Sequence, residues 1–279
     1  MKKIIIAISL LLFIFLLLGC TEQPPTKTSY NEVKAIEYDG VKINVYLDIP
    51  TTNSLDYVLL VHGTLDSDKE NVQAAKILAD KIKPIIHKEV GLVSVAYPQE
   101  NLLMGDNIIY PEAALLWLKN NAEKELGVKI NKIYLIGHSQ GGYLVTRLNT
   151  MYETDGVIAN GPGPIDLAVR CQGAEDSPNA PPSMECNLIK DKYGSAYDNP
   201  TAYSDRSMIN FAFGQKSKIL FIQGMDDTLL QTTGLEKFEE KINTCTNCAP
   251  YRFLRIKGVG HGAIVESKEA EGAVNNFIN

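Results

Sequence analysis

The segment Gly137-His138-Ser139-Gln140-Gly141 carries the clearest sign of chemistry in this sequence. It matches the pattern G-x-S-x-G, and it stands between a short apolar run at 133–136 and a helical pattern at 141–150. A strand, a sharp turn and a helix in this order lift a serine hydroxyl above a sheet. The helix also directs its first amide groups at that point, where they favour a developing negative charge. We therefore expect Ser139 to act as a nucleophile.

A serine hydroxyl is a weak nucleophile until a base takes up its proton. The imidazole side chains that could serve as this base are those of His62, His87, His138 and His261. Only His261 lies downstream of Ser139, and it follows the predicted strand 251–256 in a loop rich in glycine. Because such a loop can turn an imidazole toward the centre of the sheet, His261 is predicted to be the general base.

The base in turn needs a carboxylate that fixes its tautomer and stabilises its charged form. The apolar run 219–222 is followed by Gln223-Gly224-Met225-Asp226-Asp227, so two adjacent aspartates stand at the end of one predicted strand. The spacing alone leaves Asp226 and Asp227 as alternatives. With either of them, the order along the chain is serine, aspartate, histidine.

The elements that must position these residues alternate along the chain. Short apolar or alternating runs predict strands at 57–61, 92–96, 133–136, 157–159, 219–222 and 251–256. Helical patterns occupy 68–83, 111–126, 141–150, 233–242 and 262–278. Such alternation indicates an α/β fold with a mostly parallel central sheet that is flanked by helices on both faces. Asp39-Gly40, between the β-like runs 32–38 and 41–47, predicts an antiparallel hairpin at the N-terminal edge.

These motifs and their order resemble the α/β-hydrolase superfamily, and the resemblance covers nearly all of 30–279. It implies the α/β-hydrolase fold and a serine hydrolase that works through an acyl-enzyme. Members of the superfamily commonly carry the pattern strand-G-x-x-D at the acid position. That pattern assigns the carboxylate to Asp227 and leaves Asp226 as a turn or capping residue.

The resemblance also implies an oxyanion hole. The segment Val61-His62-Gly63-Thr64 matches the His-Gly turn of the superfamily, so the donors would be the backbone N–H groups of Thr64 and Gln140. His62 itself is then expected to be structural. Tyr97 and Pro98 end a predicted strand nearby, and we expect them to line the site.

The stretch 161–217 interrupts the alternation, because it holds six prolines and two cysteines among many polar residues. It is predicted to be an insertion that forms a lid over the sheet. Within it, Tyr203-Ser204-Asp205-Arg206-Ser207 resembles a segment of the prolyl-oligopeptidase catalytic domain, and the dienelactone hydrolases are similar in size and plan. The chain has no room for the β-propeller that usually filters peptides. A small-molecule ester is therefore the predicted substrate, and a short peptide, cleaved by a peptidase, is the alternative.

The N-terminus has the pattern of a targeting segment. Lys2 and Lys3 precede the run 4–18, in which Ser9 is the only residue that is not apolar. A run of this length is short for a membrane-spanning helix and is typical of a secretory signal peptide. Leu17-Leu18-Gly19-Cys20 resembles the lipobox of bacterial lipoproteins, in which the cysteine is lipidated and becomes the first mature residue.

We therefore expect an exported lipoprotein that is anchored in the membrane through Cys20 and faces the periplasm or the cell exterior. The chain is divided into a signal peptide at 1–19, a lipidated tether at 20–29 and a single α/β-hydrolase domain at 30–279. An uncleaved membrane anchor with an incidental cysteine is the alternative.

If Cys20 is lipidated, four cysteines remain for disulfides, which an exported domain tolerates. Proximity in the sequence favours the pairs Cys171 with Cys186 and Cys245 with Cys248. The segment Cys245-Thr246-Asn247-Cys248 could instead be a redox motif. That motif normally opens a helix after a strand, whereas here the segment follows a helical pattern and precedes a strand.

The composition excludes several classes of protein. Of the 279 residues, 45% are hydrophobic and 22% are charged, which is ordinary for a globular domain. The net charge of −6 argues against a nucleic-acid partner. The zinc-binding motif H-E-x-x-H and the dinucleotide-binding motif G-x-G-x-x-G do not occur in the sequence. The predicted chemistry requires neither a metal nor a cofactor. The leading prediction is a lipid-anchored carboxylesterase, and a non-catalytic binding lipoprotein with the same fold is the alternative.

Overall fold

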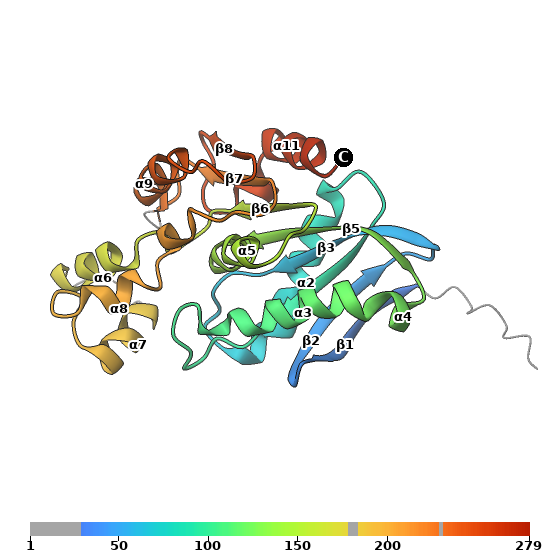
Figure 1. The fold of residues 1–279 in the computed structure, drawn as a ribbon, viewed down its shortest axis with the longest axis horizontal. Helices are drawn as coiled ribbons and strands as arrows, with labels where there is room; N and C mark the ends of the chain where they lie inside the picture. The colour runs from blue at the N-terminus through green and yellow to red at the C-terminus, as the bar shows by residue number, and fades with distance from the viewer. Residues whose placement is uncertain (1–28, 178–183, 229–230) are drawn as a thin grey trace, which may run out of the picture.

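The computed structural model describes residues 29–177, 184–228 and 231–279. The predicted signal peptide, Cys20 and all but the last residue of the predicted tether lie outside this part of the chain. An eight-stranded sheet runs through the molecule (Figure 1). Its strands are β1 Tyr30–Tyr38, β2 Val41–Ile49, β3 Ser54–Val61, β4 Val90–Ala96, β5 Lys129–His138, β6 Gly156–Asn160, β7 Ile219–Gly224 and β8 Tyr251–Ile256.

Along the sheet the strands follow the order β1-β2-β4-β3-β5-β6-β7-β8. The pairs β1–β2 and β2–β4 are antiparallel, and all later pairs are parallel. The turn of the first hairpin is Asp39-Gly40, whose φ values of 50° and 79° are both positive, as the tight turn between two strands requires. The predicted mostly parallel sheet with an antiparallel N-terminal hairpin is confirmed.

Helices cover both faces of the sheet and enclose two hydrophobic cores. The helices over the first core are α3 Ile109–Asn120, α4 Ala122–Leu126, α5 Gln140–Met151 and α9 Gln231–Asn243. Those over the second core are α2 Asn71–Ile82, α10 Ala263–Glu266 and α11 Lys268–Ile278. Because both faces are covered, β3 is buried along most of its length, which explains its continuous apolar sequence. Within the described residues, no helix combines the length and the apolar character needed to cross a membrane.

Two of the predicted helices are each divided in two. The helix expected at 111–126 is interrupted at Asn121, whose φ of −120° lies outside the helical range. The helix expected at 262–278 is interrupted at Ser267, which is extended with φ −127° and ψ 128°. The hydroxyl of Ser267 accepts hydrogen bonds from backbone N–H groups of the first turn of α11, so this serine caps the second helix.

The segment 161–217 is largely helical where the structure describes it. Its α-helices are α6 Leu167–Asp176, α7 Met184–Tyr193 and α8 Pro200–Ser204. Because β6 and β7 are neighbours in the sheet, this segment leaves the sheet and returns beside the strand that it left. Figure 1 shows α6, α7 and α8 gathered at one side of the sheet. We refer to the described part of this segment, residues 161–177 and 184–217, as the cap.

Both disulfides join the cysteines that lie closest together in the sequence. The bond between Cys171 and Cys186 links α6 to α7 within the cap. The bond between Cys245 and Cys248 closes a loop between α9 and β8. The second pair therefore follows a helix and does not open one, which is unlike the placement of a redox motif.

Candidate active site

Ser139 lies in the turn between β5 and α5 and has a strained backbone. Its φ of 55° and ψ of −120° are unusual for a residue with a side chain, and such conformations cost on the order of 1–3 kcal/mol. Three backbone hydrogen bonds hold the turn: Ser139 N–H donates to Asn160 O at 2.9 Å, and Ser139 O accepts from Tyr143 N–H at 3.1 Å and Gly163 N–H at 3.3 Å. The turn projects the serine from the end of β5, as the motif predicts.

The glycines of this turn allow it to pack against the neighbouring strand. A Cβ atom at Gly141 would lie 2.0 Å from the carbonyl oxygen of Val61, and one at Gly137 would lie 2.1 Å from the carbonyl oxygen of Gly141. A larger residue at position 141 would push the turn away from β3, and one at position 137 would push the end of β5 away from the first turn of α5. The pattern G-x-S-x-G is thus explained by backbone contact.

The structure brings His261 and Asp227 together. His261 Nδ1 lies 2.7 Å from Asp227 Oδ2, and the carboxylate side chain is fully buried. Gln223 Nε2 donates to the same carboxylate oxygen at 2.9 Å. Asp226 is exposed, and its backbone N–H donates to Val259 O at 3.0 Å as part of a turn. Of the two aspartates left open by spacing, Asp227 is therefore the one beside the histidine.

Close packing of two loops produces this contact. A Cβ atom at Gly224 would lie 2.0 Å from the carbonyl oxygen of Gly260, so the loop after β7 touches the loop after β8. Only glycine at position 224 lets the two backbones approach this far. This explains the glycine in the pattern strand-G-x-x-D that precedes Asp227.

Ser139 and His261 line one pocket of about 640 Å³. His261 Nε2, the nitrogen that faces away from Asp227, is buried and has no hydrogen-bond partner within the described residues. The structure records no hydrogen bond between it and the hydroxyl of Ser139. Catalytic hydrogen bonds are commonly long in enzymes without bound substrate and shorten when the substrate binds. The arrangement therefore places a serine hydroxyl in the same pocket as an imidazole that is oriented by a buried carboxylate.

The loop after β3 lies directly beside Ser139. A Cβ atom at Gly63 would be 3.0 Å from the Cβ atom of Ser139, so the backbone of this loop passes the serine closely. The backbone N–H groups of Thr64 and Gln140, implied to form the oxyanion hole, have no hydrogen-bond acceptor in the part of the chain that the structure describes. Two backbone donors near a serine suit the oxygen of a tetrahedral intermediate.

His62 supports this loop from beneath. Its ring stacks on Tyr97 with centroids 4.4 Å apart, its Nδ1 lies 2.8 Å from Gly63 O, and the Tyr97 hydroxyl donates to His62 O at 2.7 Å. Burial lowers the pKa of His62 from 6.5 to about 4, so its ring is neutral. The expectation that Tyr97 lines the site is wrong, because its side chain is fully buried under the loop, and Pro98 does not line the pocket either.

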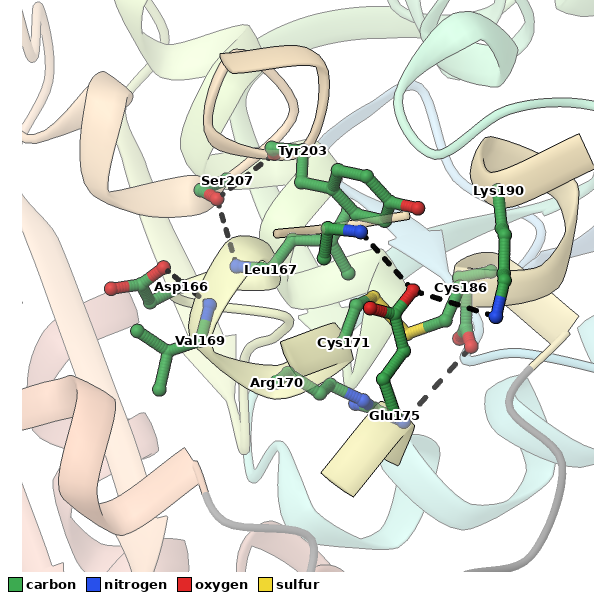
Figure 2. Close-up of a disulfide and its surroundings, with 12 residues drawn as sticks. Asp166, Leu167, Val169, Arg170, Cys171, Glu175, Cys186, Lys190, Tyr203 and Ser207 are labelled. Carbon is green, nitrogen blue, oxygen red and sulfur yellow. Dashed lines mark hydrogen bonds and ion pairs between the residues drawn. A yellow bond between two sulfur atoms is a disulfide. The ribbon is translucent and has the colours of Figure 1, made fainter. Parts of the chain in front are cut away.

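The pocket is also lined by residues that belong to none of the sequence motifs and could not be predicted from them. One wall is formed by α2 and carries Ala74, Ile77, Leu78 and Lys81. The cap supplies another part of the lining, where Arg170 Nη2 and Glu185 Oε2 lie 4.0 Å apart. Figure 2 shows Arg170 beside the bridge from Cys171 to Cys186. One feature of the sequence could have indicated these two residues: Arg170 and Glu185 each directly precede a cysteine of the cap disulfide.

Several solved structures resemble this chain. The esterase PF2001 of Pyrococcus furiosus has a TM-score of 0.63 at 19% identity, over 94% of this chain and 95% of its own. A truncated carbohydrate esterase from gut microbiota has a TM-score of 0.65 at 16% identity, over 91% of this chain and 98% of its own. A puromycin hydrolase has a TM-score of 0.61 at 17% identity, over 90% of this chain and 38% of its own. No family model and no curated protein matches the sequence.

The sheet order and these neighbours decide the fold. The chain has the α/β-hydrolase fold. At identities of 16–19% the likeness concerns the fold and not the substrate. In this α/β-hydrolase fold Ser139 follows β5, Asp227 follows β7 and His261 follows β8. Within the described residues, no group of three histidine, cysteine or acidic side chains is placed to hold a metal ion.

Proposed function

We propose that this protein is a serine hydrolase that cleaves carboxylic esters through a Ser139–His261–Asp227 triad. The observation that carries the proposal is the shared pocket. Ser139 stands on a strained turn in that pocket, and His261 stands in the same pocket with Nδ1 bound to the buried Asp227 carboxylate. A buried carboxylate, an oriented imidazole and a serine that lines the pocket are the parts that acyl transfer requires.

In the proposed reaction His261 Nε2 takes the proton of the Ser139 hydroxyl as the Oγ atom attacks the carbonyl carbon of the ester. The carbonyl oxygen becomes an oxyanion, which the backbone N–H groups of Thr64 and Gln140 stabilise. His261 then gives its proton to the alcohol oxygen as the carbon–oxygen bond breaks, leaving an acyl-enzyme. A water molecule loses a proton to His261, attacks the acyl carbon and releases the acid, and the proton returns to Ser139.

An ester is favoured over a peptide for two reasons. The solved structures of similar fold include an esterase of Pyrococcus furiosus and a carbohydrate esterase. The segment that suggested a prolyl-oligopeptidase serves the cap instead of the pocket. Its Tyr203 hydroxyl donates to Gly194 O at 2.7 Å, and its Ser207 hydroxyl accepts from Leu167 N–H at 2.8 Å (Figure 2). Amide hydrolysis stays the second candidate, because a puromycin hydrolase is among the similar structures.

Labelling with a fluorophosphonate probe tests the proposal. The full chain should be labelled, and Ser139→Ala should abolish both the labelling and ester hydrolysis, since loss of a serine nucleophile costs on the order of 10⁶-fold in kcat. Kinetics on p-nitrophenyl esters beside aminoacyl and peptidyl anilides separate the ester from the amide reaction. An unlabelled wild-type chain that hydrolyses none of these would favour the non-catalytic binding protein.

We further propose that the protein is exported and that Cys20 carries its lipid anchor. The support is the basic start, the apolar run 4–18 and the lipobox-like segment Leu17-Leu18-Gly19-Cys20. The threonine- and proline-rich residues 21–29 would then hold the catalytic domain away from the lipid surface.

A further inference from the structure

Asn160 ends β6 and is fully buried at the point where three parts of the site meet. Its backbone oxygen accepts the N–H of Ser139 at 2.9 Å. Its side-chain Oδ1 accepts the N–H of Ile264 at 3.0 Å, and its Nδ2 lies 2.8 Å from His138 Nδ1. The same Nδ2 is 3.4 Å from the carbonyl oxygen of His261. Asn160 therefore connects the nucleophile turn, His138 and the loop of the base.

These contacts determine the tautomer of His138. A backbone N–H can only donate, so the Asn160 atom beside Ile264 N must be the oxygen, and the atom beside His138 must be the NH₂ group. His138 Nδ1 consequently accepts a hydrogen bond. A neutral imidazole has one accepting and one donating nitrogen, so the proton of His138 is on Nε2.

The Nε2–H group of His138 faces the pocket. His138 lines the pocket, and the hydrogen bond recorded for its ring among the described residues is the one at Nδ1, so none is recorded at Nε2. A Cβ atom at Gly63 would lie 3.5 Å from His138 Cδ2, the carbon next to Nε2, so this edge of the ring is turned toward the loop after β3. The ring centroid is 4.7 Å from that of His261, at an interplanar angle of 51°.

His138 carries no charge at neutral pH. Burial is the largest cause that lowers its pKa to about 4; the nearby His261 and Lys81 act in the same direction, against the opposing effects of Asn160 and Asp227. The group offered to the pocket is thus a neutral N–H donor with a fixed direction. Such a donor suits an uncharged acceptor oxygen, as found in a hydroxyl, ether or carbonyl group.

We propose that His138 determines specificity by donating its Nε2–H to a second oxygen in the alcohol part of the ester. This rests on the proposed function, in which His261 returns a proton to the alcohol oxygen. The alcohol part must therefore lie beside His261, and His138 is the neighbouring ring. The substrate class is an ester whose alcohol carries another oxygen close to the ester bond, such as an ester of a polyol or a sugar.

The first test reads the tautomer directly and does not depend on activity. Long-range ¹H–¹⁵N NMR spectra of the full chain with ¹⁵N-labelled histidine, recorded near pH 7.5, should show His138 with its proton on Nε2. His62 is an internal reference, because its Nδ1 lies 2.8 Å from Gly63 O and must carry the proton. Assignment uses single His→Gln variants. A proton on Nδ1 of His138 would overturn the proposal even if the protein is an esterase.

The second test compares two esters of the same shape. Butyl butyrate and 2-methoxyethyl butyrate differ by one CH₂ group replaced by oxygen in the alcohol part. After correction for their rates of alkaline hydrolysis, the wild-type kcat/KM should favour the methoxyethyl ester by about five- to tenfold, the size expected for one neutral hydrogen bond. His138→Leu should remove this preference, and His138→Gln, which keeps an N–H donor at similar reach, should retain part of it.

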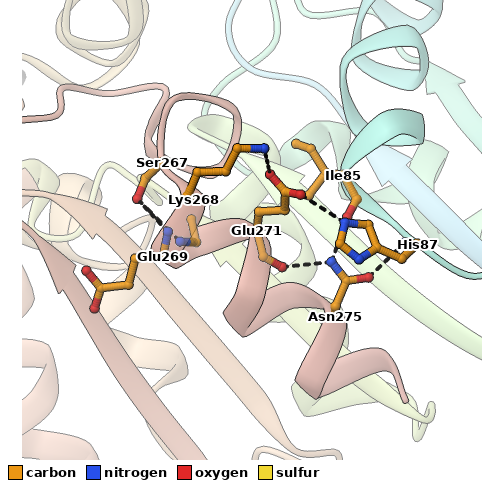
Figure 3. A network of polar contacts seen from close by, with 8 residues as sticks. Ile85, His87, Ser267, Lys268, Glu269, Glu271 and Asn275 are labelled. Atoms are coloured by element: carbon orange, nitrogen blue, oxygen red, sulfur yellow. Dashed lines mark hydrogen bonds and ion pairs between the residues drawn. The ribbon is translucent and has the colours of Figure 1, made fainter.

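The matched control is His87→Gln. His87 is exposed and away from the pocket, where its Nε2 lies 2.8 Å from Glu271 Oε1 and its backbone N–H donates to Asn275 Oδ1 (Figure 3). This variant should keep the wild-type preference. A preference that survives in His138→Leu, or that is missing from an active wild-type enzyme, would overturn the proposal. Failure of Ser139→Ala to abolish hydrolysis would instead refute the proposed function, while the tautomer measurement would still stand.

Discussion

Asp226 and Asp227 are adjacent in the sequence, yet their side chains lie in opposite environments. Asp227 is buried with its Oδ2 atom against His261 Nδ1, whereas Asp226 is exposed. Asp227→Asn should lower kcat/KM by about 10⁴-fold, because the amide cannot stabilise the imidazolium and favours the wrong tautomer. Asp226→Asn is the matched control and should leave kcat/KM nearly unchanged. Hydrolysis of p-nitrophenyl butyrate measures both, and comparable losses in the two variants would contradict the placement of the carboxylate.

Residues that follow a predicted strand within a recognisable pattern could be placed from the sequence. Ser139 and His261 are such residues, and the structure puts both in one pocket. Asn160 could not be found this way, because it belongs to no motif and reaches His138 across 22 positions of the chain. Tyr97 was placed wrongly, because its position after a strand does not reveal that its ring stacks on His62 and is buried under the loop after β3.

At the scale of elements, the bond between Cys171 and Cys186 holds α6 to α7 and thereby fixes Arg170 and Glu185 at the pocket. The two cysteines are 15 positions apart, and closing a loop of that length stabilises a fold by about 3 kcal/mol in the chain-entropy model. Replacing both cysteines by serine should therefore change KM or the range of esters hydrolysed by the enzyme. Labelling of Ser139 should change much less, because β5 and α5 do not depend on the cap disulfide.

The double replacement of Cys245 and Cys248 by serine is the control for this prediction. That pair closes a loop between α9 and β8, and neither cysteine lines the pocket. It should leave the relative kcat/KM values across a panel of p-nitrophenyl esters as they are in the wild type. Free thiols at Cys171 and Cys186 in the wild-type protein, shown by intact-mass analysis after alkylation, would remove the basis of the prediction.

Strands were easier to predict than helices for a physical reason. A strand buried on both faces needs a continuous apolar run, and β3, β4 and β7 show one plainly. The cap helices were missed because α6 buries few apolar residues, so its pattern resembles that of a polar loop. The division of the last helix was missed because Ser267 also fits within a helical pattern, and its role as a cap depends on its extended backbone.

At the scale of the whole molecule, the predicted anchor decides where catalysis takes place. If Cys20 is lipidated, the full chain should incorporate labelled palmitate and partition into the detergent phase of Triton X-114. Cys20→Ala should abolish both, because it removes the thiol that receives the lipid. Fluorophosphonate labelling of Ser139 should persist in the variant, since the catalytic domain is separate from the tether. A variant that still partitions into detergent would indicate an uncleaved apolar anchor.

Two histidines, His62, which is buried, and His138, which is half-buried, should make the stability of the whole fold sensitive to acid. Burial lowers the pKa values of His62 and His138 from 6.5 to about 4 in the folded state. In the unfolded chain each ring regains a pKa of about 6.5. Between these two values the unfolded state binds more protons than the folded state, so the free energy of unfolding falls as the pH is lowered through this window.

The contribution of His62 to the pH dependence of the free energy of unfolding can be measured separately. Its side chain is only 4% exposed, so protonation must either unfold the loop or place a charge against Tyr97. Because a tenfold difference in proton affinity corresponds to about 1.4 kcal/mol, His62 alone should lower the free energy of unfolding by about 3 kcal/mol between about pH 7 and about pH 4. Urea unfolding curves across this range measure the slope in the wild type and in His62→Gln, which lacks the titrating ring. The variant should be less stable than the wild type near pH 7 and should lose less stability on acidification. Parallel slopes for the two proteins would mean that the folded state accommodates a charged His62 at no cost, contrary to its burial against Tyr97.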